Sequence, residues 1–381
     1  MRVLSIGTDR KLFEDGSAVL SRSLEYAKKM DELHIVVFTT SRKLKVKNKK
    51  VGNNLFLYPT NSVNKLFYVF DAIKLGRKIV LENRLTSQDS VLSSQDPFET
   101  GLVGRQLKKK FGLPLQVQIH TDFFSPHFKN SLLNRIRIFI AKIVLLNADG
   151  VRVVEDFLKD SIKIFSPSFK AKIDTLPVFV DIEKILNTVP KVDLNKEFPK
   201  FKFIIFMASR LSREKRIDVA LRVFRNVLLK FPHAGLVIAG SGEDKNRLEN
   251  MVIKLELEKN VAFIGWHNDL VTLYKTADLF LVTSEYEGYG MTLIEAGAAG
   301  CPIVTTKVGV AKTDLFKNGI NCIVCSKFDV GCISSAVLEI ISDNSKRELF
   351  KHRMQDSIKS RAINQEEYAE KYVNLLKQLI Y

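Results

Sequence analysis

The chain alternates between short apolar runs and longer segments in which apolar residues recur every three or four positions. In its first half the apolar runs are RVLSIG, HIVVFTT, NLFLYP, SVLSS and LQVQIH, and the longer segments lie near residues 16–30, 64–83, 98–111 and 130–147. Short apolar runs predict buried strands, and a period near 3.6 predicts amphipathic helices. Strands that alternate with helices in this way predict an α/β fold with a parallel sheet.

The alternation stops once and then resumes. Residues 186–202, LNTVPKVDLNKEFPKFK, contain two prolines and no periodic apolar pattern, and FIIFMAS, AGLVIAG, VAFIG, DLFLVTS, PIVTT and NCIVC follow with helical segments between them. We therefore expect two Rossmann-like parallel-sheet domains that face a cleft. The N-terminal domain covers residues 1–186, a linker covers 187–200, and the C-terminal domain covers 201–363. The last segment, 364–381, is expected to be a separate amphipathic helix.

Composition is that of a folded protein without a membrane span. The 381 residues are 46% apolar, and no segment reaches the roughly 20 consecutive apolar residues that a spanning helix needs. The N-terminal MRVLSIGTDRK predicts a first strand rather than a signal peptide. These features favour a cytoplasmic location.

Positive charge is concentrated in the first half. The net charge is +17, and residues 1–185 hold 31 Lys and Arg against 19 Asp and Glu. A basic domain suggests an anionic partner such as a lipid surface, a phosphorylated substrate or nucleic acid. A solvated, lysine-rich surface would explain the same charge without any partner. The basic stretches lack interleaved aromatic residues, which argues against nucleic-acid binding.

Four cysteines lie in the last quarter of the chain, namely Cys301, Cys322, Cys325 and Cys332. NCIVC is strand-like, so Cys322 and Cys325 point to opposite faces and do not form a pair of zinc ligands. We expect buried free thiols in a reducing compartment and no metal site.

The segment EYEGYGMTLIEAGAAGCP, residues 285–302, predicts a binding loop that leads into a helix. Gly288 and Gly290 allow the backbone to approach a ligand closely, and a helix that begins near Met291 offers free N–H groups to an anion. Glu287 precedes this helix, and Glu295 lies one turn into it, where a carboxylate suits a vicinal diol. Ordinary turn chemistry and a favourable helix-end charge are the competing interpretation.

A second loop, MASRLSREKRIDVAL, follows another predicted strand. Arg210 offers a planar fork for phosphate oxygens and Lys215 a compact charge, so together they suit a diphosphate. Basic loop residues are more often simply solvated.

Three further loops give weaker signals. Gly240 and Gly242 follow a strand but lack the third glycine of a dinucleotide fingerprint, which disfavours a Rossmann oxidoreductase. His120 ends a strand beside Asp122, although a lone histidine is usually structural. Gly16 precedes a predicted helix and could face a phosphate. The sequence contains no P-loop, no G-x-S-x-G, no H-E-x-x-H and no D-x-D motif.

Taken together, these segments resemble the retaining glycosyltransferases of family 4, which have the GT-B fold. ASRLSREKRID resembles the family's G-R-L-x-x-x-K-G-x-D stretch, and EGYGMTLIEAGAAGCPIV resembles its E-G-[FY]-G-x-x-x-x-E-A-x-x-x-G-x-P-V-V block. NADGVRVVEDFLKD and DTLPVFVDIEKI resemble segments of its N-terminal domain. The resemblance implies that the terminal helix crosses back to the N-terminal domain.

The resemblance also assigns roles. It implies that Arg210 and Lys215 bind the donor diphosphate, that Glu295 holds the ribose, and that Glu287 binds a donor-sugar hydroxyl. It places His120 near the donor sugar and Gly16 in an N-terminal glycine loop, so that the implied catalytic set is Glu287, His120, Arg210 and Lys215. Other implied donor-binding residues are Trp266, Gly288, Tyr289, Gly290, Met291 and Thr292.

Some positions depart from the family pattern. Ser209 and Arg216 replace glycines that flank the Arg and Lys motif, and residues 310–312 are Val-Ala-Lys where Gly-x-Pro-Glu is common. The first loop has Gly16 but not the family's glycine pair.

The implied function is a retaining, metal-independent transfer of a sugar from a UDP- or GDP-linked donor to a glycan or lipid-linked hydroxyl. No separate cofactor is expected. The basic stretches SRKLKVKNKK (residues 41–50) and QLKKKFG, with the amphipathic NKLFYVFDAIKLGRKIV, fit peripheral association with an anionic membrane at its inner face. The alternative is a non-catalytic protein that binds nucleotide sugars. The sequence leaves the sugar, the linkage and the oligomeric state open.

Overall fold

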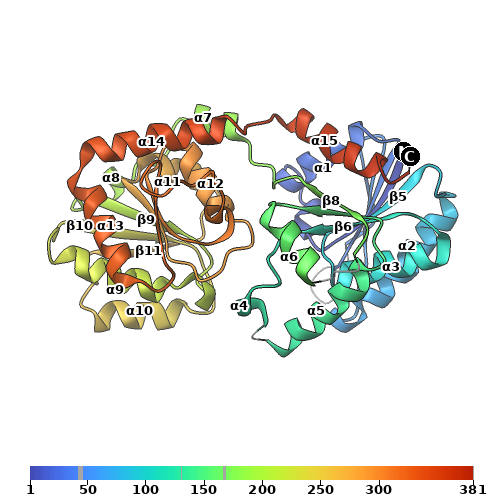
Figure 1. The fold of residues 1–381 in the computed structure, drawn as a ribbon, viewed down its shortest axis with the longest axis horizontal. Helices are drawn as coiled ribbons and strands as arrows, with labels where there is room; N and C mark the ends of the chain where they lie inside the picture. Colours follow the sequence, from blue (N-terminus) through green and yellow to red (C-terminus); the bar gives the residue numbers. More distant parts are fainter. Residues whose placement is uncertain (42–45, 130, 166–168, 381) are drawn as a thin grey trace. The chain divides into compact units, whose positions relative to one another are not determined.

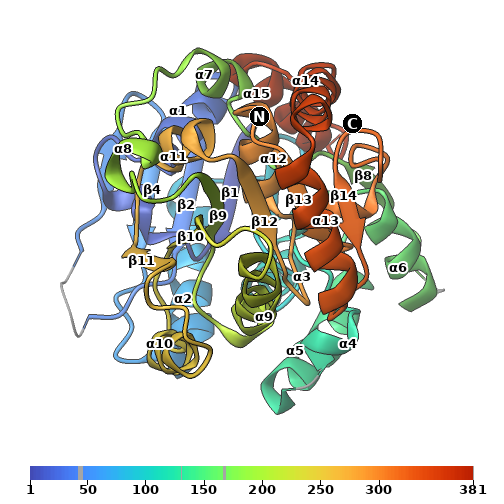
Figure 2. The same ribbon diagram turned by 90° about the vertical axis from the view of Figure 1, so that its left-hand side faces the viewer.

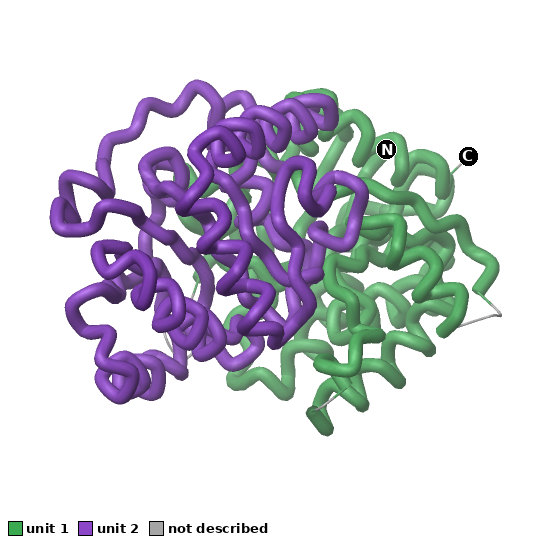
Figure 3. Tube along the Cα trace, turned by 60° about the vertical axis from the view of Figure 1, so that its left-hand side comes forward, with its two compact units in different colours: residues 1–179, 364–381 green, residues 180–363 purple. Residues whose placement is uncertain are grey.

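In a computed structural model, which describes residues 1–41, 46–129, 131–165 and 169–380, the chain forms two compact units. The first unit contains residues 1–179 and 364–381, and the second contains residues 180–363 (Figure 3). The sequence places a linker at 187–200, and in the structure Leu194 is buried in the core of the second unit.

The first unit is built on a sheet in the order β3-β4-β2-β1-β5-β6-β7-β8. Its described strands pair in parallel, except that β3 is antiparallel to β4. Helices α2 and α3 pack together, and α1 packs against α15 (Figure 1). The strands are β1 Arg2–Gly7, β2 Glu32–Val37, β3 Lys49–Val51, β4 Leu55–Pro59, β5 Ser90–Ser94, β6 Leu115–Ile119, β7 Gly150–Val153 and β8 Lys172–Thr175. The helices are η1 Arg10–Phe13, α1 Ala18–Lys28, η2 Lys65–Phe67, α2 Tyr68–Glu82, α3 Glu99–Phe111, α4 Pro126–Lys129, α5 Leu132–Leu145, α6 Phe157–Phe165 and α15 Gln365–Lys377.

The second unit has a parallel sheet in the order β11-β10-β9-β12-β13-β14. One face of the sheet packs on α11, α12 and α14, and the other packs on α9, α10 and α13 (Figure 2). The strands are β9 Phe203–Ala208, β10 Ala234–Ala239, β11 Val261–Gly265, β12 Leu279–Val282, β13 Ile303–Thr306 and β14 Ile323–Cys325. The helices are α7 Ile182–Asn187, α8 Leu194–Glu197, η3 Arg213–Lys215, α9 Ile217–Leu228, α10 Lys245–Lys254, α11 Leu270–Thr276, α12 Met291–Ala298, η4 Gly309–Lys312, α13 Val330–Ser342 and α14 Asn344–Lys359.

The C-terminal helix α15 belongs to the first unit, as the family resemblance implies. Its Tyr372 is 5% exposed, and its ring lies 4.6 Å from that of Tyr26 on α1. The Tyr372 hydroxyl accepts a hydrogen bond from Gln118 Nε2 on β6, at 3.1 Å. Aromatic burial and a satisfied hydroxyl therefore hold the last helix of the chain against the first sheet.

Two of the four cysteines are free and buried, as expected, and two are not. Burial raises the pKa of the Cys322 thiol to about 12, and Cys301 is also free. The expectation of free thiols is wrong for Cys325 and Cys332, which form a disulfide. Strand β14 ends at Cys325 and α13 begins at Val330, so the short turn between them brings the two Cα atoms within 6.0 Å.

None of the helices in the described ranges combines the length and the apolar character that crossing a bilayer requires. The basic stretch at residues 41–50 is described only in part, because residues 42–45 lie outside the described ranges.

Candidate active site

A pocket of about 280 Å³ lies among the loops that follow β9, β10, β11 and β12 of the second unit. Parallel strands present their carboxyl ends at one edge of the sheet, so these loops converge there. The pocket collects several residues that the sequence singles out, namely Arg210, Lys215, Trp266, Glu287, Met291 and Thr292.

Lys215 and Glu287 form an ion pair inside this pocket. Lys215 Nζ lies 2.7 Å from Glu287 Oε1, and each side chain is only 13% exposed. The Ser284 hydroxyl donates to the same Oε1 at 2.7 Å. Such a shielded pair is screened far less than an exposed one. It joins the loop after β9 to the loop after β12, and the Thr283 hydroxyl adds hydrogen bonds to the Lys215 and Arg216 carbonyls.

Arg210 is the more accessible cation. Its side chain is 71% exposed, and it contacts Glu214 Oε1 at 3.1 Å. Burial would raise the pKa of Glu214, but a hydrogen bond from Ser212, together with Arg210 and Lys215, lowers it below the usual value. Glu214 is therefore ionised at neutral pH, and any anion that binds Arg210 would compete with it.

The start of α12 has the backbone of an anion-binding helix end. Gly290 is its N-cap with φ of +94°, a conformation that a residue with a Cβ rarely adopts. The Tyr289 carbonyl accepts a hydrogen bond from the Val310 N–H at 2.7 Å, which fixes the loop. Met291 and Thr292 then line the pocket with the first turn of the helix, where the helix dipole favours negative charge.

Glu295 lies in α12 but does not line this pocket. Its Oε2 accepts a hydrogen bond from the Tyr274 hydroxyl at 3.4 Å, and burial raises its pKa. Gly288, Tyr289 and Gly290 are also outside the set of lining residues, although they precede Met291 directly. The roles implied for these four residues stay predictions.

Arg216 shows how one departure from the family pattern is accommodated. It stands where the family has glycine and adopts φ of +49°, which costs a residue with a Cβ roughly 1–2 kcal/mol. Its guanidinium donates to both carboxylate oxygens of Asp218, at 3.0 and 2.9 Å, and lies 4.4 Å from the Phe328 ring centroid. These contacts compensate for the strained backbone.

Sequence reasoning missed several residues of the site. Gly240, singled out only as part of an incomplete dinucleotide fingerprint, lines the pocket, and a Cβ there would lie 1.8 Å from the Ser209 carbonyl oxygen. Leu270, the first residue of α11, also lines it, as does His267 beside the predicted Trp266. The signal available for Gly240 was its position just after a strand. Within the described ranges, no group of three or more His, Cys, Asp or Glu could hold a metal ion.

His120 and Gly16 belong to the first unit. Gly16 precedes α1 with φ of +77°. His120 follows β6, and its Nε2 lies 3.1 Å from Gln118 Oε1. Gln118 Nε2 donates hydrogen bonds to the hydroxyls of Ser93 and Tyr372, which identifies it as the amide nitrogen. Gln118 Oε1 must therefore accept the hydrogen bond from His120, so His120 Nε2 carries the hydrogen. Burial, aided by Arg152 and Arg22, lowers the pKa of His120 to about 3. His120 is therefore neutral, and its Nδ1 is a hydrogen-bond acceptor.

Comparison with known proteins gives a family match for part of the chain. Residues 191–357 match the family of glycosyl transferases group 1. An uncharacterized glycosyltransferase of Methanocaldococcus jannaschii is 27% identical over 261 residues, which cover 66% of this chain and 64% of that protein. The UDP-Gal:alpha-D-GlcNAc-diphosphoundecaprenol alpha-1,3-galactosyltransferase of Escherichia coli is 28% identical over 248 residues, covering 61% and 59%. The chain therefore spans less than two thirds of the length of these two relatives.

Two further proteins match over longer stretches. The alpha-monoglucosyldiacylglycerol synthase of Streptococcus pneumoniae is 26% identical over 303 residues, covering 70% of this chain and 67% of that protein. The structure of Anabaena HepE in complex with UDP has a TM-score of 0.76 and 17% identity, and the likeness covers 99% of this chain and 100% of that one. At this identity the likeness shows the fold alone, and the GT-B fold expected from the sequence is confirmed.

The state of His120 makes stability depend on pH. His120 takes up a proton near pH 6.5 in the unfolded chain and only near pH 3 in the native state. The free energy of unfolding therefore falls as the pH drops below about 6.5, because the unfolded state then binds a proton that the native state does not. Between pH 7 and pH 5 the unfolding free energy should fall by about 2 kcal/mol more in the wild type than in His120→Asn. Urea unfolding at both pH values measures the difference. Equal decreases in the two proteins would contradict the assignment of a neutral His120.

Proposed function

Because residues 191–357 match the family of glycosyl transferases group 1, we propose that the chain transfers a sugar from a nucleotide-diphosphate donor, with retention, to a hydroxyl of a glycan or lipid-linked acceptor. The observation that carries the proposal is the pocket of the second unit. There two cations meet the N-terminus of α12, and a carboxylate lies beside them.

The donor diphosphate is proposed to bind Arg210, Lys215 and the first N–H groups of α12. In the structure each cation has a carboxylate partner, Glu214 for Arg210 and Glu287 for Lys215. A diphosphate carries more charge than either carboxylate and offers several acceptor oxygens, so it can add to or replace these partners. Glu287 would then accept a hydrogen bond from a donor-sugar hydroxyl beside the diphosphate.

The proposed reaction is same-face substitution at the anomeric carbon. The bond from this carbon to the diphosphate oxygen breaks, and its electron pair leaves with the diphosphate. The acceptor oxygen forms the new bond on the same face and gives its proton to the departing phosphate oxygen. Lys215, Arg210 and the α12 dipole stabilise the charge that develops on the leaving group. Cationic side chains serve this purpose here without a proposed metal.

A UDP-linked donor has some support from relatives. The structure of HepE was determined with UDP, and the name of the E. coli relative specifies a UDP-linked galactose. Those ligands belong to those proteins, and a GDP-linked donor stays the alternative for this chain.

Retention can be tested without knowing the acceptor, because water can take its place. When an α-linked UDP- or GDP-sugar is hydrolysed, proton NMR should show the α-anomer of the free sugar first, at a rate that EDTA leaves unchanged.

Lys215→Ala should lower this rate of hydrolysis by about 10²–10³-fold, the usual effect of losing one group that stabilises developing charge. Lys245→Ala, an exposed lysine of the same unit, is the matched control. Initial release of the β-anomer would sink the retaining mechanism, and inhibition by EDTA would sink metal independence.

An acceptor at a lipid surface is favoured by exposed apolar side chains on the first unit. On α5, Leu132, Ile136 and Phe139 are 75%, 51% and 66% exposed. Their spacing of three and four residues puts them on one face of the helix. Leu66 in η2 and Phe70 in the first turn of α2 are 84% and 70% exposed.

Basic residues accompany both apolar groups. Arg135 lies within α5, and Lys65 and Lys74 flank the apolar side chains near the start of α2. Apolar side chains mixed with Lys and Arg suit the headgroup region of an anionic membrane. The name of the E. coli relative specifies an acceptor linked to diphosphoundecaprenol, and the name of the S. pneumoniae relative specifies a glycolipid product, monoglucosyldiacylglycerol. Both names support the same proposal.

Vesicle binding tests the membrane proposal. At physiological salt the protein should sediment with phosphatidylglycerol vesicles more than with phosphatidylcholine vesicles. The double variant Phe70→Glu, Phe139→Glu should bind at least tenfold more weakly, because each buried Phe contributes about 1.5–3 kcal/mol. Leu229→Glu is the control, since Leu229 is an 82% exposed apolar residue of the second unit. Equal binding of wild type and double variant would overturn the proposal.

A further inference from the structure

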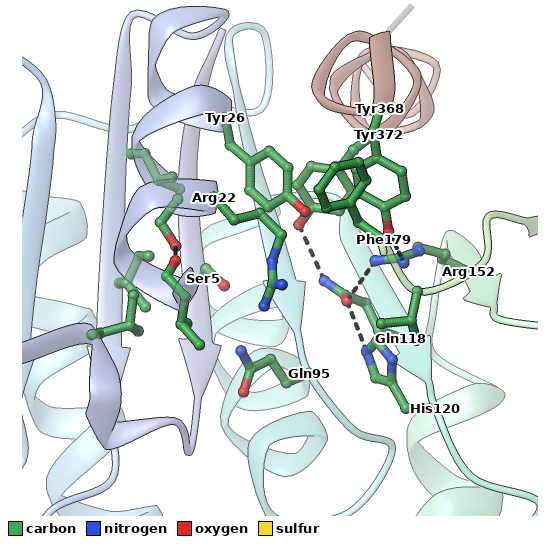
Figure 4. Close-up of a pocket in the computed structure, with 16 residues that line it drawn as sticks. Ser5, Arg22, Tyr26, Gln95, Gln118, His120, Arg152, Phe179, Tyr368 and Tyr372 are labelled. Carbon is green, nitrogen blue, oxygen red and sulfur yellow. Dashed lines mark hydrogen bonds between the residues drawn. The ribbon is translucent and has the colours of Figure 1, made fainter. Parts of the chain in front are cut away.

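The first unit contains a cavity of about 120 Å³ that the donor site does not use. Helices α1 and α15 and the strands beneath them enclose it, and Figure 4 shows Arg22, Gln95, Gln118, His120 and Arg152 around it. A buried water needs roughly 10–15 Å³ of such space, so the cavity has room for a small polyatomic group.

The lining of this cavity is cationic. Among the residues that the structure describes, the lining contains Arg22 and Arg152 and no aspartate or glutamate. Arg152 is only 4% exposed, and its hydrogen-bond partners are neutral, namely the Leu176 and Pro177 carbonyls, Gln118 and the Tyr368 hydroxyl. A buried charge is normally paired with an opposite one, and within the described residues Arg152 makes no ion pair. The cavity is therefore suited to an anion.

Arg22 supplies unused donors. It extends from α1 toward the space between Ser5, Gln95 and His120 (Figure 4), and it has no hydrogen-bond or ion-pair partner in the part of the chain that the structure describes. Its guanidinium offers five N–H groups in a planar fork that suits a phosphate.

Gln95 and Tyr26 add two neutral donors. The Thr8 N–H donates to Gln95 Oε1 at 2.9 Å, which fixes the amide so that its Nε2 remains to donate. Burial raises the pKa of Tyr26, so its hydroxyl keeps its proton. Tyr26 also lines the cavity, and its hydroxyl has no hydrogen-bond partner among the described residues.

One wall of the cavity has the opposite polarity. His120 Nδ1 is a hydrogen-bond acceptor, because Nε2 donates to Gln118. It suits a hydroxyl group rather than a phosphate oxygen. The lining thus matches a ligand that carries a phosphate and a hydroxyl close together.

We propose that this cavity of the first unit binds the phosphate of a hydroxyl-bearing phosphate ester, with Arg22 as its principal ligand, and that this ester is the acceptor. The identification as acceptor rests on the proposed glycosyl transfer. The binding of phosphate does not depend on it. The ester could be a soluble sugar or glycerol phosphate, or the headgroup of a phospholipid, and the two sources share the chemistry that the cavity recognises.

Arg152 also has a structural role that any test must separate from binding. It connects Tyr368 of α15 to the carbonyls of residues 176 and 177, so its removal would loosen the C-terminal helix. Arg22 makes no such contacts and is the residue to change.

The test is phosphate binding in a Lys215→Ala background, in which the donor pocket has lost a cation. Inorganic phosphate and sn-glycerol 3-phosphate are titrated by calorimetry, and glycerol serves as the uncharged control. Arg22→Gln should weaken binding of both phosphates at least tenfold, and Arg22→Lys should weaken it less. Lys28→Gln, on the exposed side of the same helix, should bind like the parent. No phosphate binding, or equal binding by Arg22→Gln and its parent, would overturn the proposal.

Vesicles distinguish the two sources. If Arg22→Gln lowers sedimentation with phosphatidylglycerol vesicles and Lys28→Gln does not, the ester is a lipid headgroup, and if only the soluble phosphates depend on Arg22, the ester is soluble. Because the readout is binding, a protein that binds phosphate through Arg22 but transfers no sugar would disprove the transferase proposal and the acceptor role, and leave the phosphate site standing.

Discussion

The ion pair between Lys215 and Glu287 is the interaction on which the proposed donor site depends. It lies in a pocket where both side chains are nearly shielded from water, and it joins two loops that follow neighbouring strands. Ser284 and Thr283 add hydrogen bonds to the same junction. The position of the α12 N-terminus relative to the cations follows from this junction, because Glu287 lies four residues before the first residue of the helix.

The charges of the site are balanced before any substrate is present. Lys215 with Glu287 and Arg210 with Glu214 are two pairs of opposite charge, one shielded and one open to solvent on the arginine side. This arrangement avoids two unpaired cations in a partly apolar pocket. It also means that the proposed diphosphate donor would add to or replace the carboxylate partners of the two cations. A sugar without phosphate carries no negative charge that could replace the carboxylate of Glu214 or Glu287. A diphosphate carries enough negative charge to engage both cations.

The sequence predicts the elements of this site better than their contacts. Alternating apolar runs predict the strands before Arg210, Gly240 and Glu287, and the common edge of parallel strands brings them together, as the structure shows. The helices expected near residues 16–30 and 98–111 are α1 and α3. By contrast, β7 and β8 are short and contain Arg152 and Asp174, so their apolar pattern is too weak to indicate strands.

Contacts between distant segments could not be predicted. The disulfide depends on how α13 turns back after β14, and the cationic cavity combines Arg22, Arg152 and the C-terminal Tyr368 and Tyr372, which no local pattern connects. Glu295 illustrates the same limit, because the motif predicts the carboxylate but not that it faces Tyr274.

Calorimetric titration of UDP and GDP, and of their sugar conjugates, into wild type, Lys215→Ala and Glu287→Gln tests the central claim most directly. If Lys215 binds the diphosphate and Glu287 the sugar, Lys215→Ala weakens the nucleoside diphosphate and the nucleotide sugar alike. Glu287→Gln then leaves the nucleoside diphosphate bound at least as tightly as in the wild type and weakens only the contribution of the sugar. Unchanged diphosphate binding in Lys215→Ala, or an equal loss of diphosphate binding in both variants, would contradict the account.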